Sequence, residues 1–383
     1  MNVRDAEVIK GLLLDDGFEV TDEEETYLDA VLFITCSVRQ HAEDRVWSEM
    51  GKFCKLDPKP IIGLVGCMAE NYKEKAFERI PGIDLVVGTN DIAEIPDLLK
   101  EAFELRGKRH EACPALPAAC LPAGRAGQGR ARRLIAVGRR GRDELVYRPE
   151  FREGKERAFV VISEGCDNFC SYCVVPYVRG ELRHRPPENI LKEIEFNVAQ
   201  GIKSLTLIGQ NVNAYKYNGT NFIGLLEAVN SIQGLDEFDF ITSHPKDIAG
   251  HLFETMAKLG KLKKYLHLPA QSGSDRILQL MKRGYSRRRY LDLAGEWRRA
   301  FPGAGLTTDI IIGFPGETEE DFQQTLDLLK KVRFNSAYIF KYSPRPNTEA
   351  AKLNDDVLRQ EKERRHKILL DAQKQISNEY KRK

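Results

Sequence analysis

Short apolar segments alternate with amphipathic segments along most of this chain, and this alternation constrains the fold more than any other feature of the sequence. After residue 156, strand-type runs are expected at 158–163, 204–208, 237–242, 265–268, 305–312 and 337–342. Helical patterns separate them, as at 187–200, where Ile190, Ile194 and Val198 form one face. Six strand–helix repeats predict an α/β fold with a partial parallel (β/α)6 barrel, which carries its functional residues at the carboxyl ends of the strands.

The first hundred residues show the same alternation on a smaller scale. Strand-type runs at 30–34, 60–65 and 85–88 alternate with helical patterns at 2–16, 39–56 and 92–105. This order predicts a small parallel α/β domain over residues 1–105. Cys36 and Cys67 directly follow the first two strand-type runs, so we expect them at the edge of the sheet where α/β domains bind their ligands.

The alternation stops between these two regions. Residues 106–142 are rich in Ala, Pro, Gly and Arg, have no periodicity, and contain ten Lys and Arg but one acidic residue. We therefore expect an irregular basic linker over 106–145, suited to contact RNA, and a barrel domain over 146–383. The net charge of +2 combines this basic segment with an acidic remainder. Residues 357–383 are highly charged and predict a solvated amphipathic helix at the end of the chain.

The sequence contains no apolar run long enough to span a membrane, and its first residues lack the apolar core of a signal peptide. We therefore expect a cytoplasmic protein that does not associate with membranes. In a reducing compartment, the eight cysteines are better suited to metal binding than to a disulfide framework.

Three of these cysteines, Cys166, Cys170 and Cys173, form a C-x3-C-x2-C motif directly after the first strand-type run of the barrel. Three thiolates on a short loop can bind three irons of a [4Fe–4S] cluster and leave the fourth iron open to a substrate or cofactor. A zinc site is the main alternative, although no second C-x2-C pair lies beside the motif. Three unligated core cysteines are a further alternative, which the polar residues between them disfavour.

The cysteine motif and its surroundings resemble the radical S-adenosylmethionine (SAM) methylthiotransferases. Within that family, the chain is similar to the MiaB-type tRNA-modifying branch at GCDNFCSYCVVPYVRGELRHRP (165–186), LIGQNVNAY (207–215), TSHP (242–245), LHLPAQSGSDRIL (266–278), DIIIGFPGET (309–318) and YSPRPNT (342–348). The resemblance extends through almost all of residues 1–105 and 145–383. The QNVN stretch argues against two alternative substrates of related branches, threonylcarbamoyl-adenosine in tRNA and a ribosomal protein.

The resemblance implies a site and a reaction. Cys166, Cys170 and Cys173 would hold the [4Fe–4S] cluster at which SAM is cleaved to a 5′-deoxyadenosyl radical. The implied reaction adds a methylthio group to C2 of N6-dimethylallyladenosine next to the anticodon. The implied partners are a tRNA anticodon stem-loop and an electron donor such as flavodoxin or ferredoxin, and we expect a monomer. Loops after the barrel strands would bind SAM, and we expect these contacts at Gly209, Gln210, Gln271, Ser272, Gly313, Pro315 and Gly316.

The family also binds an auxiliary [4Fe–4S] cluster on three cysteines of its N-terminal domain. Cys36 and Cys67 match two of these metal ligands, whereas the remaining one would fall before Met1. The first strand and the C-terminal RNA-binding β-barrel of the family are also missing, so we expect a sequence truncated at both ends. Two thiolates would hold the auxiliary cluster weakly, which leaves an inactive iron–sulfur protein as an alternative. No family ligand matches the remaining cysteines, Cys54, Cys113 and Cys120, and we expect Cys54 to be a packing residue.

Overall fold

The computed structural model describes residues 1–21, 28–37, 40–111, 133–138, 147–152, 154 and 156–381. The chain divides into two compact units, Asn2–Phe151 and Arg152–Lys383. The second unit begins a few residues after the predicted start of the barrel domain at 146, and the functional domain boundaries stay a prediction. Cys113, Cys120 and most of the predicted basic linker lie outside the described residues. Within the described ranges, no helix is long and apolar enough to cross a membrane.

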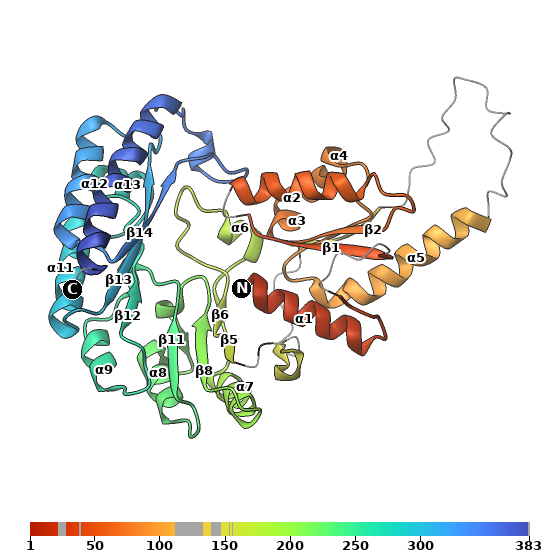
Figure 1. Ribbon diagram of the computed structural model, residues 1–383, viewed down its shortest axis with the longest axis horizontal. Coiled ribbons are helices and arrows are strands. Elements are labelled where there is room, and N and C mark those ends of the chain that lie inside the picture. Colours follow the sequence, from red (N-terminus) through yellow and green to blue (C-terminus); the bar gives the residue numbers. More distant parts are fainter. Residues whose placement is uncertain are drawn as a thin grey trace. The chain divides into compact units, whose positions relative to one another are not determined.

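The first unit is built on a parallel sheet with the strand order β1–β2–β3–β4 (Figure 1). Side chains of β2 alternate between the two faces: Ile61 and Val65 pack with α1 and α5, whereas Ile62 and Leu64 pack with α2 and α3. Helices thus cover both faces, as expected for a parallel sheet. The elements of this unit are α1 (Asn2–Asp15), β1 (Ala30–Thr35), α2 (Gln40–Phe53), β2 (Ile61–Gly66), α3 (Cys67–Tyr72), α4 (Lys75–Arg79), β3 (Leu85–Val87), η1 (Ile92–Glu94), α5 (Ile95–Glu111), β4 (Leu134–Ala136) and η3 (Pro149–Phe151).

Strands β1, β2 and β3 confirm the strand-type runs predicted for this region. The prediction of an irregular linker from residue 106 is wrong in two places, because α5 continues to Glu111 and β4 lies inside the segment. Leu134–Ala136 is too short to show a periodicity in the sequence. It becomes a strand by pairing with β3, with Leu134 opposite Leu85, so its conformation depends on tertiary contacts.

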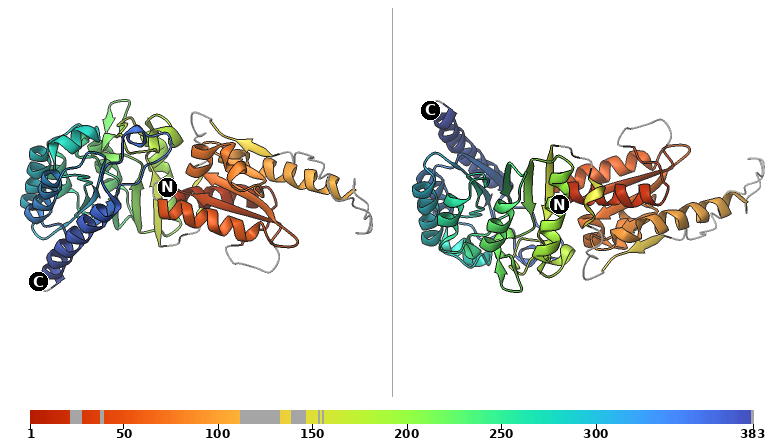
Figure 2. Two further views of the ribbon diagram at one scale, coloured as in Figure 1. Left: turned by 90° about the horizontal axis from the view of Figure 1, so that it is seen from above. Right: turned by 90° about the horizontal axis from the view of Figure 1, so that it is seen from below.

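The second unit is a partial barrel of parallel strands with helices on the outside (Figures 1 and 2). Two three-stranded parallel sheets, β5–β8–β11 and β12–β13–β14, make up its wall among the described residues. A parallel bridge between Phe238 and Leu262 joins their neighbouring edges. The six predicted strands are therefore confirmed, with the bounds β5 (Arg157–Val161), β8 (Ser204–Ile208), β11 (Glu237–Phe240), β12 (Tyr265–His267), β13 (Gly305–Ile312) and β14 (Ser336–Lys341).

Helices and short hairpins connect the barrel strands. Their apolar faces and the strands enclose one large core that includes the fully buried Trp297, Phe238 and Phe322. The connecting elements are β6 (Ser163–Glu164), α6 (Val175–Arg179), β7 (Arg183–His184), α7 (Pro187–Ala199), η4 (Val212–Ala214), β9 (Lys216–Tyr217), β10 (Thr220–Asn221), α8 (Phe222–Ser231), η5 (Pro245–Asp247), α9 (Leu252–Lys258), α10 (Asp275–Leu280), α11 (Arg287–Ala300), α12 (Glu319–Val332), η6 (Ala350–Lys352) and α13 (Arg359–Lys381).

The C-terminal helix α13 is less solvated than its charge pattern predicts. Leu369 and Ile376 are buried in the barrel core. Arg365 is also buried, and its Nη1 lies 2.7 Å from Glu317 Oε2 in the loop after β13. The sequence does not reveal this ion pair, because its two partners are far apart along the chain.

The predicted capping box at the start of α12 is present. The Thr318 N–H donates to Asp321 Oδ2 at 2.9 Å, and the Asp321 N–H donates to Thr318 Oγ1 at 3.3 Å. Asp321 also accepts a hydrogen bond from Ser274 Oγ at 2.5 Å and one from Arg276. Burial alone would raise the pKa of the Asp321 carboxyl, but hydrogen bonds from Arg276, Ser274 and Thr318 lower it to about 2.

These contacts make Asp321 a source of acid sensitivity. Because its pKa in the folded chain lies below the usual 3.8, the ionised carboxylate contributes stability that is present above about pH 4 and lost as the pH falls towards about 2. We expect Asp321→Asn to lower the free energy of unfolding near neutral pH by about 2 kcal/mol and to weaken the acid dependence of stability. Urea unfolding near neutral pH and near pH 3 measures both effects.

The control for this prediction is Asp292→Asn, which removes only an exposed pair with Arg288 and should change stability by less than about 1 kcal/mol. An unchanged acid dependence in Asp321→Asn would contradict the assignment.

Candidate functional site

The three cysteines of the C-x3-C-x2-C motif lie on one loop that follows β5 and β6. Gly165 turns the chain into this loop with a φ of +76°. Cys166 and Cys170 are buried and Cys173 is half-buried. The Cys173 N–H donates to the carbonyl of Cys170 at 2.9 Å, and the Cys166 N–H donates to the carbonyl of Gly180 at 3.2 Å. The sequence thus places the three thiols on one tight, hydrogen-bonded loop at the carboxyl end of a barrel strand.

Ser171, between the second and third cysteines, fixes this loop to distant parts of the barrel unit. Its N–H donates to the carbonyl of Met281 at 3.1 Å, and its hydroxyl donates to the carbonyl of Leu280 at 2.8 Å. The N–H of Ala350 donates to the Ser171 carbonyl at 2.7 Å. Ligands held in this way need little rearrangement when a metal cluster binds.

A buried cation lies beside the second cysteine. Arg283 is 4% exposed, and its Nη1 lies 3.3 Å from Cys170 Sγ and 3.3 Å from the Tyr172 hydroxyl. Its Nη2 donates to the Pro269 carbonyl at 3.0 Å, and its Nε donates to the Tyr285 hydroxyl at 3.2 Å. A guanidinium in this position stabilises a thiolate through charge and a hydrogen bond.

The thiols themselves are in a low-dielectric environment. Burial raises the pKa of Cys166, and burial followed by the charge of Cys170 raises the pKa of Cys173 to about 12. These two thiols are therefore protonated near neutral pH in the metal-free chain. A metal that binds them as thiolates must displace their protons.

The three cysteines have the donor chemistry of an iron–sulfur site. A [4Fe–4S] cluster binds each thiolate at a different iron, so three thiols on one loop can serve three of its irons. A zinc ion instead takes four ligands that converge on one point.

Polar atoms gather at the carboxyl ends of three neighbouring strands, β5, β8 and β11. Several buried ones have no hydrogen-bond partner in the described part of the chain, and an unpaired buried polar group costs about 1–3 kcal/mol. Such atoms indicate that a polar ligand completes the site. SAM carries an amino group, a carboxylate and ribose hydroxyls that can pair with them, so the residues fit this cofactor. The atoms are Ser163 Oγ, Gln210 Oε1, Asn211 Oδ1, Ser243 Oγ and His244 Nε2.

Four of the predicted SAM contacts follow β8 and β12. Gly209 lies so close to β6 that a Cβ added to it would be 2.5 Å from Ser163 Oγ, and Gln210 contributes one of the unpaired atoms. Gln271 has a positive φ of 63°, and Ser272 is buried with its hydroxyl 3.3 Å from Thr325 Oγ1. All four lie at the carboxyl ends of barrel strands, and their contact with SAM stays a prediction.

The loop after β13 carries the other three predicted contacts, Gly313, Pro315 and Gly316. Gly313 and Gly316 have φ values of +65° and +80°, as expected for a sharp turn into α12. Their N–H groups are already engaged, since Gly313 donates to Glu317 Oε2 at 2.6 Å and Gly316 donates to Asp356 Oδ1 at 2.7 Å. Any contact of this loop with SAM must therefore use other atoms.

In the first unit, the two predicted auxiliary ligands follow neighbouring strands. Thr35 is paired with Gly66 in the parallel register of β1 and β2, and Cys36 and Cys67 come next along each strand. The two thiols therefore occupy the same edge of the sheet. Two thiolates alone do not complete the three-cysteine set that the resemblance implies. Cys54 packs against the hydrophobic cluster around α2, away from this pattern.

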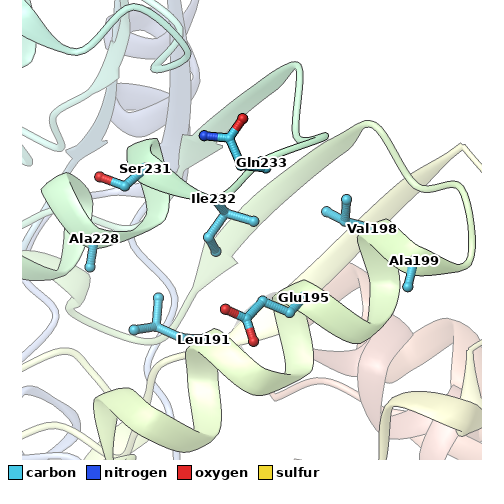
Figure 3. A pocket seen from close by; sticks show the side chains of 8 residues that line it. All are labelled: Leu191, Glu195, Val198, Ala199, Ala228, Ser231, Ile232 and Gln233. Atoms are coloured by element: carbon cyan, nitrogen blue, oxygen red, sulfur yellow. The ribbon is translucent and has the colours of Figure 1, made fainter.

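A surface groove of about 560 Å³ lies between α7 and α8 (Figure 3). It is lined by α7 residues between Leu191 and Ala199, by Ala228 and Ser231 at the end of α8, and by Ile232 and Gln233. These segments lead into the amino ends of β8 and β11. The groove is therefore at the end of the barrel opposite to the cysteine loop, and we assign it no role in the site.

Sequence reasoning missed two residues of the site, Arg283 and Tyr285, and assigned no role to His244. Arg283 and Tyr285 lie in a loop without periodicity, and only the folded chain brings Arg283 to Cys170. His244 belongs to the TSHP segment, so the resemblance did contain a signal for it.

Comparison with known proteins gives two family matches. Residues 160–329 match the radical SAM superfamily, and residues 1–88 match the uncharacterized protein family UPF0004. The chain is 42% identical to the tRNA-2-methylthio-N(6)-dimethylallyladenosine synthase of Moorella thermoacetica, over 98% of this chain and 81% of the relative. It is 41% identical to the protein of the same name from Carboxydothermus hydrogenoformans, over 99% of this chain and 82% of the relative.

Solved structures support the fold. The chain resembles the cobalamin-dependent SAM radical enzyme OxsB with a TM-score of 0.51 and 15% identity, over 98% of this chain and 50% of that one. At this identity the likeness concerns the fold alone.

Proposed function

Because the chain belongs to the radical SAM tRNA methylthiotransferases of the 2-methylthio-N6-dimethylallyladenosine synthase type, we propose that it adds a methylthio group to C2 of N6-dimethylallyladenosine next to the anticodon of a tRNA. The resemblance seen in the sequence is thereby confirmed at the level of the family. The observation that carries the proposal is the similarity to these synthases over nearly the whole chain, together with three thiols on one loop at the carboxyl end of a barrel strand.

Each part of the site has a role in this proposal. Cys166, Cys170 and Cys173 would bind three irons of a [4Fe–4S] cluster, and Arg283 would stabilise the Cys170 thiolate. When bound, the cluster and SAM supply a 5′-deoxyadenosyl radical that removes the hydrogen at C2 of the adenine. The polar side chains after β5, β8 and β11 would orient SAM. Burial of the cysteine loop keeps water away from the reacting atoms.

We further propose the partners and setting of the reaction. A low-potential electron carrier such as flavodoxin or ferredoxin would reduce the cluster, since cleavage of SAM consumes one electron. The substrate adenosine would be presented from an unpaired anticodon loop, because proteins read RNA bases mostly where they are unstacked. The protein would act as a monomer in the cytoplasm, where tRNA is modified.

Anaerobic reconstitution with iron and sulfide, followed by incubation with SAM and a reductant, tests the radical chemistry. We expect 5′-deoxyadenosine to form and the iron content to rise to about four per chain for one cluster, or about eight for two. A fully loaded cluster that forms no 5′-deoxyadenosine would overturn the proposal.

The substrate is tested by comparing three tRNAs whose adenosine next to the anticodon is prenylated, threonylcarbamoylated or unmodified. We expect a methylthio group on the prenylated tRNA alone, measured by mass spectrometry of the nucleosides. Modification of the threonylcarbamoylated tRNA would instead support the alternative substrate.

A further inference from the structure

The two sequence motifs QNVN and TSHP form one structural unit at the carboxyl ends of β8 and β11. The Asn213 amide donates from Nδ2 to the His244 carbonyl at 2.9 Å, and the His244 N–H donates to Asn213 Oδ1 at 2.8 Å. Both residues are buried. The Val212 N–H also donates to the Thr242 carbonyl at 3.0 Å. The QNVN stretch therefore fixes the position of His244.

The hydrogen bonds of His244 determine which ring nitrogen carries the proton. The Lys246 N–H donates to His244 Nδ1 at 3.2 Å, so Nδ1 is an acceptor and has no proton. In a neutral imidazole the proton is then on Nε2. Burial, followed by the charges of Arg283 and Lys246, lowers the pKa of His244 to about 2. The ring therefore stays neutral near physiological pH, and Nε2–H is a permanent donor.

This donor has no acceptor in the described part of the chain. His244 is 5% exposed, and its Nε2 is buried without a hydrogen-bond partner. The Tyr285 ring packs nearly perpendicular to the imidazole, with the ring centroids 5.7 Å apart and the planes at 77°. The positive charges of Arg283 and Lys246 favour an anionic acceptor near this position. The only anionic group of SAM is its carboxylate.

We propose that His244 Nε2–H donates a hydrogen bond to the carboxylate of bound SAM and that Asn213 holds the imidazole in place for this contact. The inference rests on the proposed function, since it requires SAM as the cofactor. His244 is then a SAM-binding residue with a fixed tautomer, and Asn213 is a positioning residue that acts through it. Neither residue serves as a general acid or base.

The test compares the binding of SAM and of decarboxylated SAM to the full, anaerobically reconstituted chain by calorimetry. His244→Phe removes the donor but keeps a ring of similar shape. We expect it to weaken SAM binding about 10- to 100-fold, the range for losing a hydrogen bond to a charged group. Binding of decarboxylated SAM should change by less than about threefold, since that ligand has no acceptor for Nε2–H. His244→Gln, which retains an N–H donor, should restore part of the affinity for SAM.

Asn213→Ala should weaken SAM binding by a smaller factor, about 5- to 10-fold, since it loosens the imidazole without removing it. The matched control is Asn230→Ala. Asn230 also bridges two segments, since this residue of α8 accepts a hydrogen bond from the Lys261 N–H in the turn before β12, but this bridge lies at the amino end of the strands. The control should leave the affinity for both ligands unchanged.

If His244→Phe loses affinity equally for SAM and for decarboxylated SAM, the proposal is overturned, because the carboxylate is then not the partner of Nε2–H. Unchanged SAM binding would also overturn it, because Nε2–H would then contribute nothing to the affinity for SAM. Failure of the unsubstituted chain to bind SAM at all would count against the proposed function as well. If the unsubstituted chain binds SAM normally and His244→Phe binds it with the same affinity, only the proposed role of His244 is refuted.

Discussion

Cys166→Ala is expected to abolish the reductive cleavage of SAM. Cys166 is buried, and its N–H donates to the Gly180 carbonyl. The other two thiols of the loop, Cys170 and Cys173, would each bind a different iron and cannot replace it. Losing a direct ligand should cost more than the roughly 10–100-fold that is typical of losing an outer-shell partner. The measurement is the rate of 5′-deoxyadenosine formation after reconstitution, with the iron content of each sample determined in parallel.

Cys54→Ala is the matched control for this prediction. Cys54 is half-buried in the hydrophobic cluster around α2, so its loss should affect stability slightly and SAM cleavage not at all. Cleavage by Cys166→Ala at a rate comparable to that of the unsubstituted chain would show that the cluster is held by other ligands.

Gly165→Ala is expected to have the second largest effect, although it leaves all three thiols in place. A Cβ at this position would lie 2.0 Å from the carbonyl oxygen of Glu181 and 2.5 Å from that of Gly180. Both neighbours are main-chain atoms, which cannot move aside as a flexible side chain can. The φ of +76° adds a penalty of about 1–2 kcal/mol for any residue with a Cβ. Relief of the clash must displace Cys166, which is hydrogen-bonded to Gly180.

We expect reconstituted Gly165→Ala to bind less than about one iron per chain at the motif, compared with about four for an intact cluster. Gly303→Ala separates the clash from the backbone penalty, because Gly303 has a φ of +82° but open space around its missing Cβ. Iron binding by Gly165→Ala at the level of Gly303→Ala would mean that the turn before Cys166 does not position the ligand.

The fold was predictable where the pattern is local. Strand-type runs such as 204–208 lie between helical segments long enough to show a period of 3.6 residues, so β8 and its neighbours could be placed from the sequence. The capping box of Thr318 and Asp321 was also readable, because both partners lie within one turn. Strand β4 could not be predicted from the sequence, because three residues are too few to show a periodicity. Pairing with β3 decides their conformation.

The residues of the site also divide into those that a local pattern reveals and those that only the fold brings together. Cys166, Cys170 and Cys173 are close in sequence, and their spacing alone indicates a cluster with an open iron. Arg283 reaches Cys170 only through the fold. The clamp between Asn213 and His244 likewise joins two loops that the sequence separates. Contacts between distant segments are set by packing, and a single sequence carries no signal for them.

A tRNA substrate with deuterium at C2 of its prenylated adenosine tests the radical methylthiolation directly. If the chain is a radical SAM methylthiotransferase, the deuterium should appear in 5′-deoxyadenosine and the methylthio group should occupy C2. Mass spectrometry of both products detects the two events in one reaction. Formation of 5′-deoxyadenosine without deuterium, with the tRNA still labelled at C2, would contradict the removal of this hydrogen by the radical.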